Sequence, residues 1–214
     1  MTKRHVRTVA LGMAAGLGML AASEAAAQAC AGFPTAGRES SLGARASFPA
    51  EGTSLGVAGS HNFAGPLAVF GSVGLLRPEA GGDDRSIVSA GAAYEVGRFI
   101  PAVPGGLSIC PVAGASLSAA DNATRVTVPV GVGIGTSLGV APGVAVMPYV
   151  LPQFVLTRVS LKNVDVASDT NFGIEVGALG RVGPLFAGVG ANKAFVDGSD
   201  VDLQARVGLT FGTR

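Results

Sequence analysis

The chain has 214 residues and a formal net charge of +1, and only 14% of its residues are charged. With 15 basic residues against 14 acidic ones and no tryptophan, it offers neither the basic patch nor the aromatic surface of a nucleic-acid-binding protein. Its length fits one domain or one barrel.

The first 29 residues have the features of a secretory signal peptide. The positive start, the apolar stretch and the cleavage site are Lys3, Arg4 and Arg7, then Val9 to Ala22, then Ala27-Gln28-Ala29. This apolar stretch is shorter than the about 20 residues that a membrane-spanning helix needs. We therefore expect a signal peptide over 1–29, an N-terminal periplasmic segment over 30–39 and a folded domain over 40–214.

Strict alternation of apolar and polar residues dominates the chain beyond residue 40. In 201–211 every odd position is apolar and every even position is polar or glycine. Such a period of two indicates a β-strand whose two faces meet different surroundings. The pattern predicts ten strands, at residues 40–48, 53–63, 67–77, 85–97, 107–118, 125–139, 144–159, 171–182, 185–196 and 201–211.

The distribution of side chains on these strands favours a barrel in a membrane. The apolar face is made of Val, Leu and Ala, whereas the other face carries Arg, Gln and Glu. This arrangement predicts an all-β fold, an antiparallel up-and-down transmembrane β-barrel with a polar interior. Prolines inside the proposed strands leave eight strands as the alternative to ten, and each proline is expected to mark a bulge or a hydrated place on the lumen side: Pro111, Pro129, Pro148 and Pro152.

The connections between the predicted strands fall into two classes. Alternate connections are nearly uncharged, and three of them are short: Ala64-Gly65-Pro66, Ala141-Pro142-Gly143 and Gly183-Pro184, with a longer fourth from Arg98 to Gly106. The other connections carry acidic residues: Glu51, Glu79, Asp83, Asp84, Asp121, Asp165, Asp169, Asp197 and Asp200. Outer-membrane barrels have short periplasmic turns and longer outside loops, so this sorting supports the barrel.

With its leader, alternating strands, tight turns and final segment Val207-Gly208-Leu209-Thr210-Phe211, the chain resembles the small outer-membrane β-barrel proteins of diderm bacteria. The resemblance implies a location in the outer membrane after export through the periplasm. It implies contact with outer-membrane lipid, periplasmic chaperones and the barrel-assembly machinery, with Phe211 as the assembly signal. It also implies aromatic girdles, for which the chain offers Tyr94, Tyr149, Phe48, Phe63, Phe70, Phe99, Phe154, Phe195 and Phe211.

Two further sets of residues are candidates for the interior. Charges in a narrow lumen need partners, so we expect a network among Arg45, Glu95, Arg125, Glu175, Arg181 and Arg206. Cys30 and Cys110 remain after cleavage, and an even count in an oxidising compartment suggests one disulfide. Alternation places Cys110 on the lumen side, so the bond would draw the N-terminal segment across the periplasmic mouth.

The sequence carries no strong signature of an enzyme. His61 is the one histidine after the leader, and its alternation with Phe63 points it outward while Ser60 points the other way. We expect a non-enzymatic, monomeric barrel without cofactor, metal or nucleic acid, acting in envelope structure or as a narrow pore. The alternatives are a surface-recognition or adhesion barrel acting through its acidic loops and a secreted soluble β-sandwich.

Overall fold

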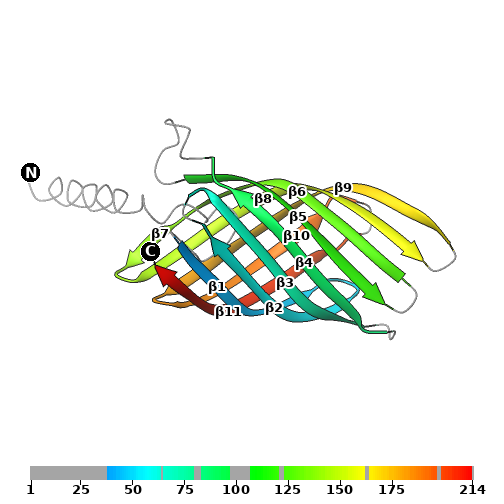
Figure 1. Cartoon of the computed structure of the whole chain (residues 1–214), viewed down its shortest axis with the longest axis horizontal. Helices are drawn as coiled ribbons and strands as arrows, with labels where there is room; N and C mark the ends of the chain where they lie inside the picture. Colours follow the sequence, from blue (N-terminus) through cyan, green and yellow to red (C-terminus); the bar gives the residue numbers. More distant parts are fainter. Residues whose placement is uncertain are drawn as a thin grey trace, which may run out of the picture.

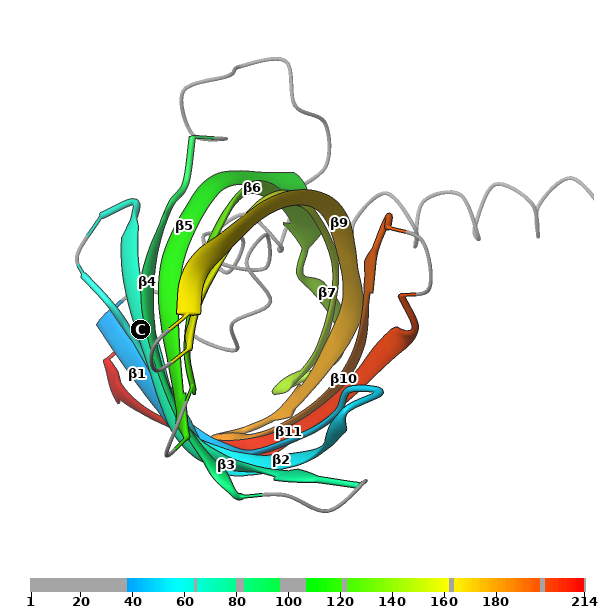
Figure 2. The ribbon, with the colours of Figure 1, turned by 90° about the vertical axis from the view of Figure 1, so that its right-hand side faces the viewer.

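The computed structural model describes residues 38–63, 65–79, 83–96, 107–120, 123–161, 164–196 and 199–213, and the structural statements below concern these residues. They fold into one closed antiparallel sheet (Figures 1 and 2). No helix among them is long and apolar enough to cross a membrane. The strands are β1 (Arg38–Phe48), β2 (Gly52–Asn62), β3 (Leu67–Pro78), β4 (Arg85–Tyr94), β5 (Leu107–Ala120), β6 (Ala123–Thr136), β7 (Leu138–Ala141), β8 (Val144–Leu161), β9 (Val164–Val182), β10 (Leu185–Ala194) and β11 (Val201–Thr213).

Successive strands pair as neighbours, and β1 pairs with β11 to close the ring. The β7 strand continues β6 along β8 in one register, because Gly135 lies opposite Tyr149 and Leu138 lies opposite Val146. Ser137 interrupts the strand between them. The described wall therefore has ten strands, which confirms the predicted fold class and strand number and contradicts the soluble β-sandwich, whose two sheets would have free edges.

The two ends of the barrel differ in their connections. We call the end where Arg38 lies opposite Thr213 the terminal rim, and the other end the opposite rim. The three short uncharged turns lie at the terminal rim, where Gly143 and Gly183 adopt positive φ values of 74° and 58° in two-residue turns. The fourth connection, from Arg98 to Gly106, lies outside the described residues. Glycine adopts positive φ values without steric cost. The predicted sorting of turns is thus confirmed.

The connection predicted between strands 144–159 and 171–182 is longer than the one that the structure shows. At the opposite rim, β8 and β9 are joined over residues 162–163 only, and Asp165 and Asp169 lie inside β9. These two strands have 18 and 19 residues, longer than their neighbours (Figure 1). The two acidic residues suggested a loop, whereas the structure has β-strand at both positions.

The apolar faces of the strands point outward, as predicted. Val130 and Val132 on β6 are 46% and 43% exposed, and Leu203 and Val207 on β11 are 56% and 55% exposed. Their polar neighbours in the chain face the interior, where serine, glycine and the charged residues gather. The alternation of the sequence is therefore the alternation between the outside and the lumen.

The prolines do not produce bulges, so that prediction is wrong. Opposite Pro129 the pairing is interrupted, but Ala113 opposite Val130 and Ser116 opposite Thr127 keep one register on both sides. The expectation of lumen-side positions also fails for three of the four, since Pro111, Pro148 and Pro152 alternate with the inward residues of β5 and β8 and face outward. A proline has no amide proton to donate to the ladder, but its pyrrolidine ring is apolar and matches the outer face.

Glycines allow close contact at the seam where the ring closes. Gly43 of β1 lies directly opposite Gly208 of β11, and the Phe186 ring covers both. A Cβ atom on Gly208 would stand 2.8 Å from Phe186 Cζ and would overlap the Leu42 carbonyl oxygen. The seam therefore has no room for a side chain at this position.

We predict that Gly208→Ala destabilises the barrel by about 1–3 kcal/mol, the usual cost of overpacking. Gly180→Ala is the matched control, because a Cβ there would have only one neighbour, the Ala187 oxygen at 3.8 Å. The temperature at which the folded band disappears from detergent gels measures the effect. Equal melting of the two variants would contradict this account of the seam.

Candidate functional site

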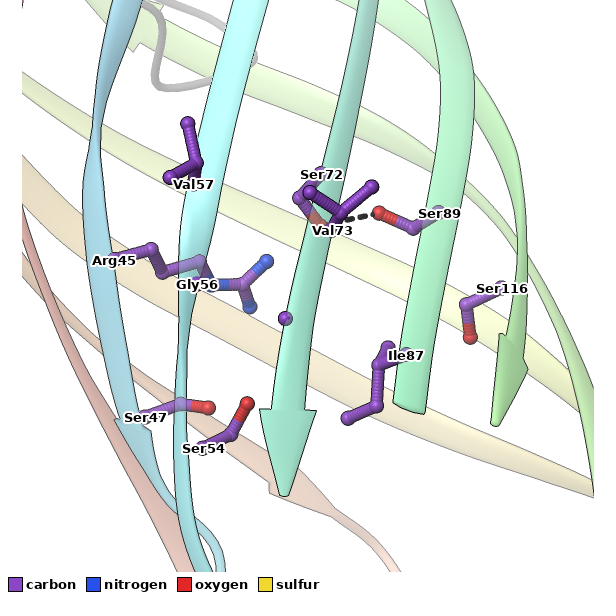
Figure 3. A pocket seen from close by; sticks show the side chains of 11 residues that line it. Arg45, Ser47, Ser54, Gly56, Val57, Ser72, Val73, Ile87, Ser89 and Ser116 are labelled. Atoms are coloured by element: carbon purple, nitrogen blue, oxygen red, sulfur yellow. Dashed lines mark hydrogen bonds between the residues drawn. The ribbon is translucent and has the colours of Figure 1, made fainter. Parts of the chain in front are cut away.

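The lumen contains connected polar space toward its centre. One cavity of about 170 Å³ is lined by Arg45 and five serines, and a second of about 150 Å³ is lined by Arg45, Glu175, Gln204 and Arg206. Figure 3 shows the first cavity, with Arg45 and the serines directed toward the same space. The inward faces of adjacent strands build both cavities, since alternate residues of each strand reach the interior.

Tyr149 of β8 holds the central polar group together. Its hydroxyl donates to Glu175 Oε1 at 2.8 Å and accepts from the Arg206 guanidinium at 2.7 Å. Gln204 Nε2 also donates to Glu175 Oε1, at 2.7 Å. The guanidinium carbon of Arg206 lies 5.7 Å from the centre of the Tyr149 ring, within cation–π range. We call Tyr149, Glu175, Gln204 and Arg206 the central network.

Arg45 lies beside the central network without joining its hydrogen bonds. In the β1–β11 register it is directly opposite Arg206, and it is within electrostatic range of Glu175. Two like charges directly opposite each other on adjacent strands are destabilising unless a partner compensates them. Glu175 supplies one negative charge for the two arginines.

A buried ion pair lies near the terminal rim. Arg181 donates from Nη1 and Nη2 to the two carboxylate oxygens of Glu39, at 2.7 and 2.8 Å, and from Nε to the Gly183 carbonyl oxygen at 2.9 Å. The two side chains are only 9% and 4% exposed. This bidentate pair connects β1 with the end of β9, which are distant in the sequence.

The same end of the lumen is packed with side chains. Glu95 accepts a hydrogen bond from the Ser108 hydroxyl at 2.9 Å, and both residues are buried. Close to them Ala68, Ala93 and Cys110 form one apolar cluster, and a second consists of Met147, Leu179 and Phe186. The terminal half of the lumen is therefore largely filled.

The opposite rim has the more spacious end of the lumen. A cavity of about 390 Å³ is lined there by Arg85, Arg125 and Asp169 among others. Glu51 lies 3.3 Å from the Arg85 guanidinium and 3.5 Å from that of Arg125, with all three side chains between 37% and 47% exposed. Such exposed pairs hold long side chains in place only weakly.

The structure thus places the six predicted lumen charges inside the barrel but divides them among three levels. Arg45, Glu175 and Arg206 lie at the centre, Glu95 and Arg181 near the terminal rim, and Arg125 at the opposite rim. Their main partners were not predicted from the sequence: Tyr149, Gln204, Glu39 and Glu51. For Tyr149, Gln204 and Glu39 the alternation was the available signal, since odd residues of β1 and β8 and even residues of β11 face the interior. Glu51 lies in the turn between β1 and β2, where the alternation gives no signal.

Two residues expected in the aromatic girdles are found elsewhere. Tyr149 belongs to the central network, and Phe70 lines the second cavity, so both point inward. Near the opposite rim, Phe172 on the outer surface lies 5.3 Å from Phe154 and 5.6 Å from Phe195 between ring centroids. Phe63, Tyr94 and Phe211 are exposed at the terminal rim. Phe99 lies outside the described residues.

His61 faces outward beside Phe63, as its alternation indicated, at a centroid distance of 4.7 Å. Its Nδ1 lies 2.8 Å from the Ser40 hydroxyl of β1, a neighbour that the sequence analysis did not identify. Ser60 faces inward and shares a hydrogen bond of 2.7 Å with Ser41.

Two sequence predictions extend beyond the described residues. Cys110 is inward-facing and 1% exposed, but Cys30 is outside the described ranges, so their pairing stays a prediction. The proposed signal peptide over 1–29 lies outside them as well. Phe211 is on the last strand opposite Ser40, and Gly212 and Thr213 continue that strand beyond it.

No protein-family model matches the chain, and no curated protein matches it by sequence. Among solved structures it is similar to a KdgM porin in complex with disordered oligogalacturonate, with 13% sequence identity and a TM-score of 0.38. The match covers 81% of this chain and 99% of the porin chain. The fold assignment rests on the strand pairing described above.

We predict that Glu39→Ala destabilises the barrel by about 3–5 kcal/mol, because Arg181 would lose two charge-assisted hydrogen bonds while its guanidinium stays buried. Glu51→Ala, which breaks only half-exposed contacts, should cost about 0–1 kcal/mol. Denaturant unfolding of the refolded variants measures both free energies. Equally small losses would show that the Glu39–Arg181 pair does not secure the terminal rim.

Proposed function

We propose that the chain is an integral outer-membrane β-barrel, monomeric and non-enzymatic, that serves envelope structure and narrow passage of small solutes. The observation that carries this proposal is the combination of an apolar outer surface with a lumen that contains cavities lined by polar residues, in a closed sheet. Each half of that combination has its own physical consequence.

The outer surface supports insertion into lipid. Large apolar side chains cover the middle of the wall, for example Leu55 at 61%, Val73 at 57% and Val189 at 64% exposed. A soluble monomer rarely exposes a continuous apolar surface of this extent. Lipid acyl chains could cover this surface without burying polar groups. The exposed aromatic residues near both rims would then lie at the two membrane–water interfaces.

The closed ring supports the same conclusion. Within hydrocarbon, every backbone amide and carbonyl group must find its hydrogen-bond partner in the protein. The pairing of β1 with β11 removes the free edges that an open sheet would expose. In this proposal the terminal rim faces the periplasm, since both barrel ends of the chain lie there, and the acidic opposite rim faces outward.

The lumen supports narrow rather than wide passage. Side chains fill the terminal half, while cavities occupy the centre and the opposite half. Water and small solutes therefore have room between the central network and the opposite rim, and a restricted route between the network and the terminal rim. For the partners, we propose outer-membrane lipid, periplasmic chaperones and the barrel-assembly machinery, with Phe211 as the residue that the machinery reads.

The long β8–β9 hairpin favours a second candidate, a surface-recognition barrel. Its strands exceed their neighbours in length, so the hairpin extends the wall at the opposite rim (Figure 1). Asp169 and Asn171, in the part of β9 that extends beyond its pairing with β10, share a hydrogen bond of 2.9 Å and offer a polar contact surface. Binding of a partner there would not require an open lumen.

Two arginine substitutions test the membrane location. Val189 lies in the middle of the outer surface, and Val201 lies at the opposite rim with 50% of its surface exposed. In a bilayer, Val189→Arg should destabilise the barrel by about 2–4 kcal/mol and Val201→Arg by about 0–1 kcal/mol. In a barrel surrounded by water both changes would be nearly neutral, so equal unfolding free energies in lipid vesicles would contradict the proposal.

Planar bilayers test the narrow passage. We expect small, stable conductance steps from the refolded protein, because the terminal half of the lumen restricts the water-filled path. The control is Val201→Arg, which changes the rim charge outside the lumen and should leave the step size unchanged. A correctly folded barrel that never conducts would refute the proposed passage of solutes. The proposed structural role and the surface-recognition role would then remain.

A further inference from the structure

Arg45 is a lumen cation for which the described residues supply no hydrogen-bond or ion-pair partner. It lines both central cavities and is exposed to the space between them. No described residue accepts a hydrogen bond from its guanidinium or forms an ion pair with it. In contrast, Arg181 and Arg206 are each fixed by short hydrogen bonds.

The charge balance around Arg45 is unfavourable without a further anion. Arg45 and Arg206 are direct neighbours across the β1–β11 seam, and Glu175 is the carboxylate that interacts electrostatically with Arg45. Glu175 Oε1 already accepts from Tyr149 and Gln204, and Arg206 is tied to Tyr149. One positive charge therefore remains without compensation at the centre of the lumen.

The wall that faces Arg45 is rich in hydroxyl groups. The inward residues of β1 to β5 that line the cavity include Ser47, Ser54, Ser72, Ser89 and Ser116. Figure 3 shows these hydroxyls and the Arg45 guanidinium around one space, with Ser72 and Ser89 joined by a hydrogen bond of 2.7 Å. A serine hydroxyl donates one hydrogen bond and rotates to suit its acceptor.

Glycines keep this wall flat. At Gly74 a Cβ atom would stand 2.7 Å from the Leu55 carbonyl oxygen, and at Gly56 directly opposite it would stand 2.3 Å from the Val73 carbonyl oxygen. The resulting cavity of about 170 Å³ is large enough for a small polyatomic anion with some of its water. A guanidinium fork matches the two oxygens of a carboxylate or a phosphate.

We propose that the cavity beside Arg45 is a binding site for a small solute that carries an oxyanion, a carboxylate or a phosphate. The Arg45 guanidinium pairs with the anionic oxygens, and the serine hydroxyls donate to the remaining acceptors of the solute. The solute supplies the missing negative charge between Arg45 and Arg206. This inference rests on the proposed function in that the lumen, open at the opposite rim, is the route to the site.

Calorimetric titration of the folded protein in nonionic detergent at low salt tests the proposal, with citrate, inorganic phosphate and uncharged glycerol as probes. We expect saturable one-to-one binding of citrate or phosphate, and none of glycerol. Arg45→Gln should weaken the binding by about 10- to 100-fold, the usual loss for a hydrogen-bonded charge. Arg45→Lys should restore part of the affinity, since it keeps the charge without the fork.

The matched control is Arg77→Gln, which removes the same charge from a side chain 82% exposed on the outer surface. Its affinity for the probes should equal that of the wild type. Arg45→Gln should also fold as well as the wild type, because it removes a like-charge contact. An added probe should raise the melting temperature of the wild type and of Arg77→Gln, but not that of Arg45→Gln.

Wild-type protein that binds neither citrate nor phosphate would overturn the proposal, as would equal loss of binding in Arg45→Gln and Arg77→Gln. The titration needs no bilayer, so its result is separate from that of the conductance experiment. A barrel that conducts but binds no anion would refute only the Arg45 site. A barrel that binds the anion and stays silent in bilayers would refute only the passage.

Discussion

The pairing of β1 with β11 is the interaction on which the rest of the structure depends. It runs without a break from Arg38 opposite Thr213 to Phe48 opposite Leu203. A slip of one residue would turn every side chain of a strand to the other face. The register therefore fixes the apolar outer surface, and it also brings Gly43 against Gly208 and Arg45 against Arg206. The tight seam and the uncompensated charge at the lumen centre follow from one set of hydrogen bonds.

The packing of the lumen differs along its length, and its two halves have different roles. Near the terminal rim, Arg181 with Glu39 and the cluster around Leu179 pack the interior as in a soluble protein core. Toward the opposite rim, serine and glycine replace these larger side chains, and the cavities widen from about 170 to about 390 Å³. Packing at one end stabilises the ring, so the other end can retain cavities and an arginine without an ion-pair partner among the described residues.

The sequence predicted the faces of the strands well because a period of two is a local property. Val207 and Leu209 face outward and Arg206 faces inward, as the alternation requires. It did not predict the position of each residue along the barrel axis, because in a barrel of tilted strands this position depends on the register between neighbouring strands. For this reason the six predicted lumen charges fall into three groups instead of one network.

Other failures have the same local origin. Asp165 and Asp169 indicated a loop, but they lie in β9, whose outer end extends the wall. Tyr149 and Phe70 matched the composition of an aromatic girdle, whereas their positions in the alternation place them inside. Glu39 could not be assigned to Arg181 because 142 residues separate them, and only the closed ring brings the two together.

The orientation of the two faces relative to lipid and water is the central claim, and spin-label accessibility in lipid vesicles tests it most directly. Val73 and Ser72 are adjacent on β3, and Val73 is 57% exposed on the outer surface while Ser72 lines the lumen cavity. A nitroxide at residue 73 should be relaxed by dissolved oxygen, and one at residue 72 by a water-soluble nickel chelate. Equal access of the chelate to both positions would contradict the account.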